Sequence, residues 1–239
     1  MIKLHAFGPG FGLPEHSPFV TKTEVHLKML DLAYEKVPAR PDQSPKGQLP
    51  FIDDGGTVVA DSHFIRAYLE KKTGRDLDAG LDARERAGAW AIERMMENHF
   101  APTSGYARWI LPDNFAKGPA HFVDGAPEEL RPKLRAELQD RVREHFRAVG
   151  VARHAEDQIV ELGAHSLGAL AALLGDRPYL FGAEPVGSDA APFALLAGIL
   201  TPFFDSPLRR RAEGFPTLVA YAARMMTRFY PGHAWPGPR

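Results

Sequence analysis

At 239 residues, the chain is long enough to bury one large hydrophobic core or two smaller ones. Its 29 lysines and arginines nearly balance its 30 aspartates and glutamates, so the net charge of -1 gives no general attraction to nucleic acid or to an anionic membrane. The absence of cysteine excludes disulfides, thiolate metal sites and a protein thiol as nucleophile, and it fits a reducing compartment.

The chain shows no sign of a membrane or export segment. The apolar N-terminus is interrupted at Gly8-Pro-Gly10, too early for a signal peptide. The longest apolar stretch, residues 191–204, contains two prolines and falls short of the ~20 residues needed to span a bilayer. We therefore expect a cytoplasmic protein that does not associate with membranes.

The first quarter of the chain predicts a small mixed β-sheet. Short runs of alternating or β-branched residues indicate the strands, and Asp54-Gly-Gly56 predicts a hairpin because glycine tolerates positive φ. The predicted strands cover residues 2–7, 34–37, 49–53 and 57–60.

An amphipathic helix is predicted over residues 18–33. Proline is well placed in the first turn of a helix, and Ser17 before it is a good N-cap. Apolar residues recur at helical spacing, whereas Lys22, Glu24 and Lys28 are expected on the polar face.

A second helix opens at Ser62, the expected cap, and ends at Gly74, a favourable C-cap residue. The order of elements predicts a thioredoxin-like α/β domain over residues 1–75. A domain boundary is expected near residues 75–81, followed by an all-α domain over residues 82–230.

The second domain is predicted to contain helices and no strands. One helix starts at Asp82, and a buried helix and a final helix are also expected. The region 112–127 is rich in glycine and proline and is predicted to be a loop, while the tail 231–239 is expected to be loosely ordered. The remaining helices are predicted near residues 130–146, 159–174, 189–200 and 217–230.

Three motifs resemble those of the glutathione transferase superfamily: Ser17-Pro-Phe-Val20, Gly47-Gln-Leu-Pro50 and Asp61-Ser62. The resemblance covers nearly the whole chain, and its details are similar to a subgroup of metaxin-like and failed-axon-connections-like proteins. It implies the two-domain architecture described above and a homodimer. One departure is Val186, which stands where the superfamily usually has a threonine or serine N-cap.

The resemblance also implies a glutathione site. Leu49, before a cis Pro50, would pair its backbone with the cysteinyl part of glutathione, and Gln48 could reach the glycyl carboxylate. Asp61 and Ser62 would hold the γ-glutamyl end, for which an acid and a hydroxyl at a helix N-terminus are chemically suited. The alternative for Ser62 is that it only caps its helix.

Ser17 is the implied catalytic residue, with Phe19 packing beside it. In the superfamily the first residue of this motif faces the sulfur of glutathione, and a serine hydroxyl there donates a hydrogen bond to the thiolate. A serine cannot form a mixed disulfide, which favours addition or substitution by the thiolate over thiol-transferase chemistry. The alternative is that Ser17 is only an N-cap.

A pocket for the co-substrate is expected between the domains, with Tyr106 and Trp109 as candidate lining residues, although aromatic residues at such spacing are often core. No convincing metal-binding set is present in the sequence. The leading hypothesis is thus a glutathione transferase acting on a small electrophile. A non-catalytic metaxin-like binding or scaffold protein and a glutathione-dependent isomerase, dehalogenase or peroxidase remain as alternatives.

Overall fold

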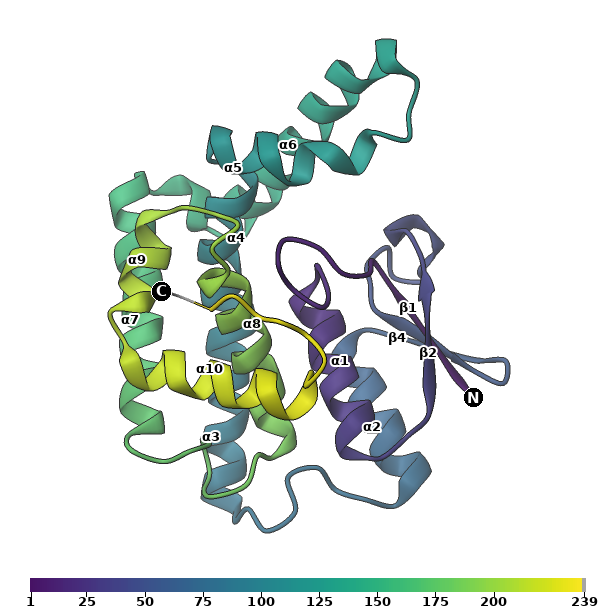
Figure 1. Ribbon diagram of the computed structural model, residues 1–239, viewed down its shortest axis with the longest axis vertical. Helices are drawn as coiled ribbons and strands as arrows, with labels where there is room; N and C mark the ends of the chain where they lie inside the picture. The colour runs from purple at the N-terminus through teal and green to yellow at the C-terminus, as the bar shows by residue number, and fades with distance from the viewer. Residues whose placement is uncertain (238–239) are drawn as a thin grey trace.

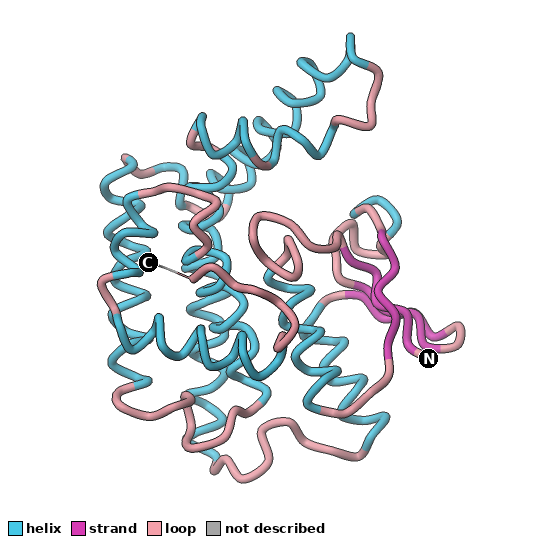
Figure 2. Tube along the Cα trace, in the orientation of Figure 1, coloured by secondary structure: helices cyan, strands magenta, loops and turns pink. Residues whose placement is uncertain are grey.

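The four predicted strands form one mixed sheet in the order β2-β1-β3-β4 (Figure 2). The computed structural model describes residues 1–237. β1 runs parallel to β2 and antiparallel to β3, and β4 completes the sheet as the antiparallel partner of β3. The strands are β1 (Ile2–Ala6), β2 (Tyr34–Pro38), β3 (Phe51–Asp54) and β4 (Thr57–Ala60).

Helices α1 (Pro18–Met29) and α2 (Ser62–Thr73) pack against the sheet, and α1 also contacts helix α8 (Ala190–Leu200) of the second half (Figure 1). The amphipathic interpretation of α1 is therefore wrong for two residues. Lys22 is 1% exposed and Glu24 is 3% exposed, because the helical domain covers the face of α1 that a small isolated domain would leave in water.

The second half contains only helices among the residues that the structure describes, which confirms the predicted fold class. α8 is its central element, and ten of its eleven residues are buried. In addition to α8, the α-helices are α3 (Ala83–Arg94), α4 (Ala101–Trp109), α5 (Pro112–Lys117), α6 (Arg131–Ala148), α7 (Glu156–Leu174), α9 (Pro207–Glu213) and α10 (Pro216–Phe229).

Between α3 and α4 the helix continues through a π-helical segment, η2 (Met95–Phe100). Pro102 lies just beyond it and has no N–H to donate to the preceding turn. The N–H of Ala101 bonds to the carbonyl of Met96, five residues back, which is the π pattern. The wider turn thus carries the chain past the proline without ending the helix.

The region 112–127 is not the predicted loop. It contains α5 and the 3-10 helix η3 (Pro119–Val123), each of which begins with a proline at its first position. Proline is favourable there because its φ angle suits a helix start. Together with η4 (Glu128–Leu130) and α6, these segments form an arm, residues 112–148, that projects beyond the rest of the molecule (Figure 1).

As the sequence indicates, Val186 provides no hydroxyl cap before α8, and Ser188 does not replace it. The Ser188 hydroxyl donates to Asp78 at 2.7 Å instead. Asp189 holds this turn together, because its carboxylate accepts hydrogen bonds from the N–H groups of Leu180 and Val186. Burial raises the pKa of Asp189 to about 6.

The described part of the C-terminal tail, residues 231–237, forms no helix or strand, yet two of its side chains contact the rest of the molecule. Trp235 packs against the helical core, and His233 Nε2 lies 3.1 Å from the carbonyl oxygen of Gly12. The last two residues of the predicted loose tail, 238–239, lie outside the described residues. The tail therefore contributes to holding the loop between β1 and α1.

Candidate functional site

Ser17 occupies the N-cap position of α1, with φ -96° and ψ 124°. Its backbone carbonyl accepts the first helical hydrogen bond, from the N–H of Thr21 at 3.0 Å. The Ser17 side chain, however, makes no capping hydrogen bond to the helix. The hydroxyl is therefore available to a ligand at the positive end of the helix dipole.

Glu15 fixes both ends of the loop that leads to Ser17, the β1–α1 loop (residues 7–17). This carboxylate is only 1% exposed and accepts hydrogen bonds from the N–H of Gly8 at 2.9 Å and from the N–H of Ser17 at 3.3 Å. Lys36 of β2 forms a 2.9 Å ion pair with it. Burial raises the pKa of Glu15, and Lys36 opposes that rise. The sequence analysis missed Glu15, because its partner Lys36 lies on a different element.

The peptide bond between Leu49 and Pro50 is cis, as the family resemblance predicts. The carbonyl of Pro50 accepts a hydrogen bond from the N–H of Asp61 at 3.2 Å, which ties the cis-proline turn to the start of α2. Among residues 1–237, the backbone N–H and carbonyl of Leu49 have no hydrogen-bond partner. The preceding residue, Gln48, is exposed. The backbone of Leu49 is thus unpaired, although the residue is only 7% exposed.

Asp61, and not Ser62, is the cap of α2, which corrects the sequence expectation. The Asp61 carboxylate accepts a hydrogen bond from the N–H of His63 at 2.9 Å, and its backbone has a positive φ of 83°. Positive φ is uncommon for residues other than glycine and recurs at functional sites. Asp61 is exposed, whereas Ser62 is buried at the first helical position.

A buried ionic cluster connects this region to the helical domain. Lys22 of α1 pairs with Glu93 and with Glu97, each at 2.7 Å, and Arg94 pairs with the same two carboxylates. Burial raises the pKa of Glu93, but the charge and the hydrogen bond of Lys22, together with the charge of Arg94, outweigh this effect and lower that pKa to about 2. His63, next to Ser62, has Nδ1 3.9 Å from Glu93.

Tyr106 and Trp109, the predicted pocket residues, lie in different surroundings. Tyr106 lines a small pocket inside the helical domain together with Ile159 and Leu208, whereas the Trp109 ring lies 5.7 Å from the ring of Phe122 in η3. Phe19 is half-buried in the first turn of α1. The roles of these three residues at a ligand site stay predictions.

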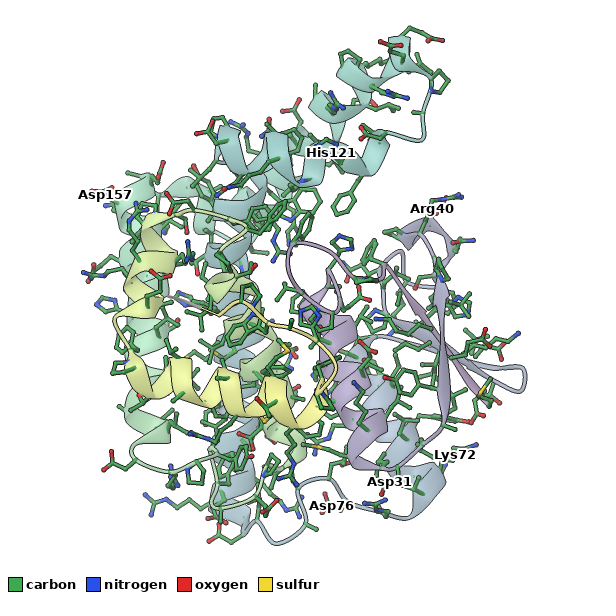
Figure 3. The ribbon with its side chains drawn as sticks, viewed as in Figure 1. Asp31, Arg40, Lys72, Asp76, His121 and Asp157 are labelled. Carbon is green, nitrogen blue, oxygen red and sulfur yellow. The ribbon has the colours of Figure 1, made fainter. Side chains whose placement is uncertain are left out.

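The structure also gathers aromatic rings that the sequence analysis did not connect. Phe11 of the β1–α1 loop lies 5.1 Å from Phe203, which follows α8, and 6.1 Å from Phe122 of the arm. His16 packs edge-on against Phe11 at 4.4 Å. His121 of η3 lies on the part of the arm nearest to this loop (Figure 3). No local pattern marks the group, because its members come from segments far apart in the sequence.

Arg108 of α4 lies next to the Phe11 ring. Its guanidinium donates a hydrogen bond to the carbonyl of His16 at 3.1 Å and lies 5.5 Å from the centre of the Phe11 ring. Burial lowers the pKa of Arg108 to about 10, so that the group stays charged at neutral pH. Burial, with a contribution from Arg108, also lowers the pKa of His16.

The described residues contain neither a metal-binding cluster nor a membrane-spanning helix. Residues 1–237 contain no group of three or more histidine, aspartate or glutamate side chains arranged to hold a metal ion. Within the same residues, no helix is both long enough and apolar enough to cross a membrane.

Comparison with known protein families gives two matches. Residues 18–114 match the family described as the glutathione S-transferase N-terminal domain, and residues 163–225 match the glutathione S-transferase C-terminal domain. The N-terminal match includes the start of α1, the cis-proline turn and the start of α2.

Three relatives are similar over most of this chain. The isoprene-epoxide glutathione S-transferase of Rhodococcus sp. strain AD45 is 31% identical, over 96% of this chain and 99% of its own length. Failed axon connections of Drosophila melanogaster is 32% identical over 97% of this chain, which spans only 58% of that protein. Metaxin-2 of Mus musculus is 28% identical over 78% of this chain and 72% of its own length.

Among solved structures, the β-etherase LigF from Sphingobium sp. strain SYK-6 superimposes with a TM-score of 0.68. The two chains are 19% identical, and the match covers 97% of this chain and 99% of LigF. At this identity the similarity establishes the shared fold.

Proposed function

Since the chain belongs to the glutathione S-transferase family, we propose that it binds glutathione along the free backbone of Leu49 and activates the thiol at Ser17. The cysteinyl part of glutathione pairs with Leu49 as an added strand. The γ-glutamyl end lies at the start of α2, where Asp61 pairs with its ammonium and Ser62 with its carboxylate. Gln48 is available for the glycyl carboxylate.

The proposed chemistry is attack by the glutathione thiolate on an electrophilic carbon. The Ser17 hydroxyl donates a hydrogen bond to the sulfur, and the N-terminus of α1 adds its dipole. A free thiol has a pKa of about 8.5, and lowering it by about two units requires about 2.7 kcal/mol of preferential stabilisation of the thiolate. The thiol proton passes to solvent, a carbon–sulfur bond forms, and the bond from that carbon to its leaving atom breaks with the electron pair on that atom.

This proposal rests mainly on the Ser17 hydroxyl, which lies at the N-terminus of α1 and makes no capping hydrogen bond to the helix. Two contacts support it: Glu15 holds the backbone of Ser17, and the bond from the N–H of Asp61 to the carbonyl of Pro50 ties the segment after Leu49 to the start of α2. The similarity to an isoprene-epoxide glutathione S-transferase further suggests that epoxides belong among the electrophiles to be tested.

The test is a titration of the protein with glutathione, followed by calorimetry and by thiolate absorbance against pH. Ser17→Ala is expected to retain binding but to raise the pKa of the bound thiol by about one to two units, the value of one charge-assisted hydrogen bond. The matched control is Ser104→Ala, whose hydroxyl bonds within α4. An unchanged thiol pKa in Ser17→Ala would remove the catalytic role from Ser17.

Binding is tested separately by Asp61→Asn and Ser62→Ala. Both variants are expected to weaken glutathione binding by about tenfold or more, since Asp61→Asn removes the charge that pairs with the ammonium and Ser62→Ala removes the hydroxyl that donates to the carboxylate. If neither variant changes the dissociation constant, the γ-glutamyl end lies elsewhere.

A second candidate is a binding protein without catalysis, favoured by the similarity to Failed axon connections and to metaxin-2, whose names denote no transferase. It predicts that glutathione binds without a lowered thiol pKa, or does not bind. We further propose a cytoplasmic location and a homodimer, in keeping with a glutathione-dependent enzyme of this family.

A further inference from the structure

The β1–α1 loop is built to hold the ring of Phe11 in one place. Phe11 has a φ of 58°, a left-handed conformation that is strained for a phenylalanine. Its carbonyl accepts a 2.6 Å hydrogen bond from the Thr201 hydroxyl. The neighbouring Gly10 cannot carry a side chain, because a Cβ there would lie 1.9 Å from His16 Nε2.

Phe122 and Phe203 contact Phe11, and Phe7 is connected to them through Phe122; we define these four rings, Phe7, Phe11, Phe122 and Phe203, as the aromatic patch. Phe7 stacks with Phe122 at 6.2 Å, and Phe11 contacts both Phe122 and Phe203. Phe7 and Phe203 are each 36% exposed and Phe122 is 43% exposed. These partly exposed rings come from three separate parts of the chain, the β1–α1 loop, the arm and the segment after α8, and an exposed apolar patch of this kind typically marks a binding site.

The aromatic patch is continuous with the proposed thiol position. His16 directly precedes Ser17, and its ring lies 4.4 Å from Phe11 and 5.7 Å from Phe122. The aromatic patch thus lies beside the residue that precedes Ser17, the residue to which we assign the sulfur.

The charges around the aromatic patch are positive. Arg108 lies 5.5 Å from the Phe11 ring centre and the Lys117 ammonium 5.8 Å from that of Phe203. Asp124, a carboxylate on the same arm, is already paired with His121 and Arg135. The surroundings thus disfavour a cationic ligand and suit a neutral or anionic ring.

We propose that the aromatic patch binds an aryl group of the electrophile, so that this enzyme prefers substrates with a flat aromatic ring over saturated ones of equal size. The inference rests on the proposed glutathione site. Edge-to-face and offset contacts with surrounding rings favour an aromatic group beyond the simple burial of its area. Phe122 and Phe203 are the specificity-determining residues, because they are exposed and come from outside the thioredoxin-like sheet.

The test compares binding of S-benzylglutathione and S-(cyclohexylmethyl)glutathione by calorimetry, which needs no turnover. The two conjugates differ only in a planar or a saturated ring, and the saturated ring is at least as apolar. We expect S-benzylglutathione to bind about tenfold more tightly, as a few favourable ring contacts would give. Equal binding, or tighter binding of the cyclohexyl conjugate, by a protein that binds glutathione would overturn the aryl preference alone.

Single substitutions test which rings produce the preference for the aryl group. Phe122→Leu and Phe203→Leu are each expected to reduce the benzyl-to-cyclohexylmethyl ratio by about threefold while the affinity for glutathione is kept. Leu130→Ala, at an exposed position of the same arm, is the control and is expected to leave the ratio unchanged. If neither phenylalanine variant changed the benzyl-to-cyclohexylmethyl ratio, other residues would produce the preference and the proposal would be contradicted. If glutathione and both conjugates fail to bind, the proposed function fails and this inference fails with it.

Discussion

At the scale of single residues, a buried carboxylate holds the backbone of Ser17, the residue to which we assign thiol activation. Glu15 joins Gly8 to Ser17 through one side chain and is neutralised by Lys36. Lys36 also pairs with Glu24 at 3.2 Å, so one lysine serves two buried carboxylates. The backbone of Ser17 is thus held by a loop carboxylate whose ion-pair partner, Lys36, lies on β2.

Glu15→Gln tests this positioning role. An amide of the same size cannot accept from both N–H groups and loses the ion pair, so the free energy of unfolding should fall by about 1–3 kcal/mol. We expect kcat to fall while the KM for glutathione changes little, because Ser17 moves and the γ-glutamyl site does not. Denaturant unfolding and steady-state kinetics measure both effects.

The exposed Glu129→Gln on the arm serves as the control. Equal losses in kcat and in glutathione affinity would show that Glu15 supports the fold as a whole and has no special link to Ser17.

At the scale of secondary-structure elements, α1 is shared by both halves of the molecule. Its residues from Val20 to Leu27 are all buried, because the sheet lies on one side and α8 on the other. Lys22 is one of the charged residues in this stretch, and its two glutamate partners come from α3 and η2. Removing one partner of a buried ion pair leaves an uncompensated charge in a poorly solvated place.

Lys22→Met is expected to lower the free energy of unfolding at neutral pH by about 3–5 kcal/mol. In the native protein the pKa of Glu93 lies at about 2, below its ordinary value of 4.5. Its ionisation therefore stabilises the folded state above pH 4.5, and this contribution is lost as the pH falls towards 2. In the variant the pKa of Glu93 rises. The difference in free energy of unfolding between the native protein and the variant should therefore become smaller as the pH is lowered.

Urea unfolding at neutral and at mildly acidic pH measures this change, with the exposed Lys3→Met as the control. If Lys22→Met lost the same free energy of unfolding at both pH values, Lys22 would contribute through packing and not through charge.

At the scale of the whole molecule, hydrogen bonds from the segment between α2 and α3 connect the two halves. Asp78 accepts from the N–H and the hydroxyl of Ser188, at 3.0 Å and 2.7 Å, and pairs with Arg66 of α2 at 2.6 Å. A single carboxylate thus joins α2 to the turn before α8. The domain limits of 1–75 and 82–230 remain a prediction, but these bonds cross between the two segments.

Asp78→Ala should therefore reduce the free energy of unfolding by about 3 kcal/mol, since it leaves a half-buried arginine and the Ser188 turn without their partner. Thermal or denaturant unfolding measures the loss. The exposed Asp140→Ala on α6 should change the stability by less than about 0.5 kcal/mol. A similar effect in both variants would mean that Asp78 contributes no more than a surface charge.

The short-range features of this protein were readable in the sequence. The strands, the hairpin at Gly55-Gly56 and the starts of α1 and α2 depend on the preferences of neighbouring residues, and the family motifs lie within such local segments. The prediction of a loop over residues 112–127 was wrong. Proline interrupts the interior of a helix but is favourable at its first position, and the sequence alone did not show which of the two applies here.

Only the tertiary structure determined which charged and aromatic side chains meet. Lys22 was expected in water and is buried, because a second layer of helices covers α1. Glu15 and Lys36, or Phe11 and Phe122, are brought together by chain segments whose separation leaves no periodic signal. Local conformation follows from neighbouring residues, whereas the position of a ligand-binding surface follows from packing between elements, which the pattern of one chain does not encode locally.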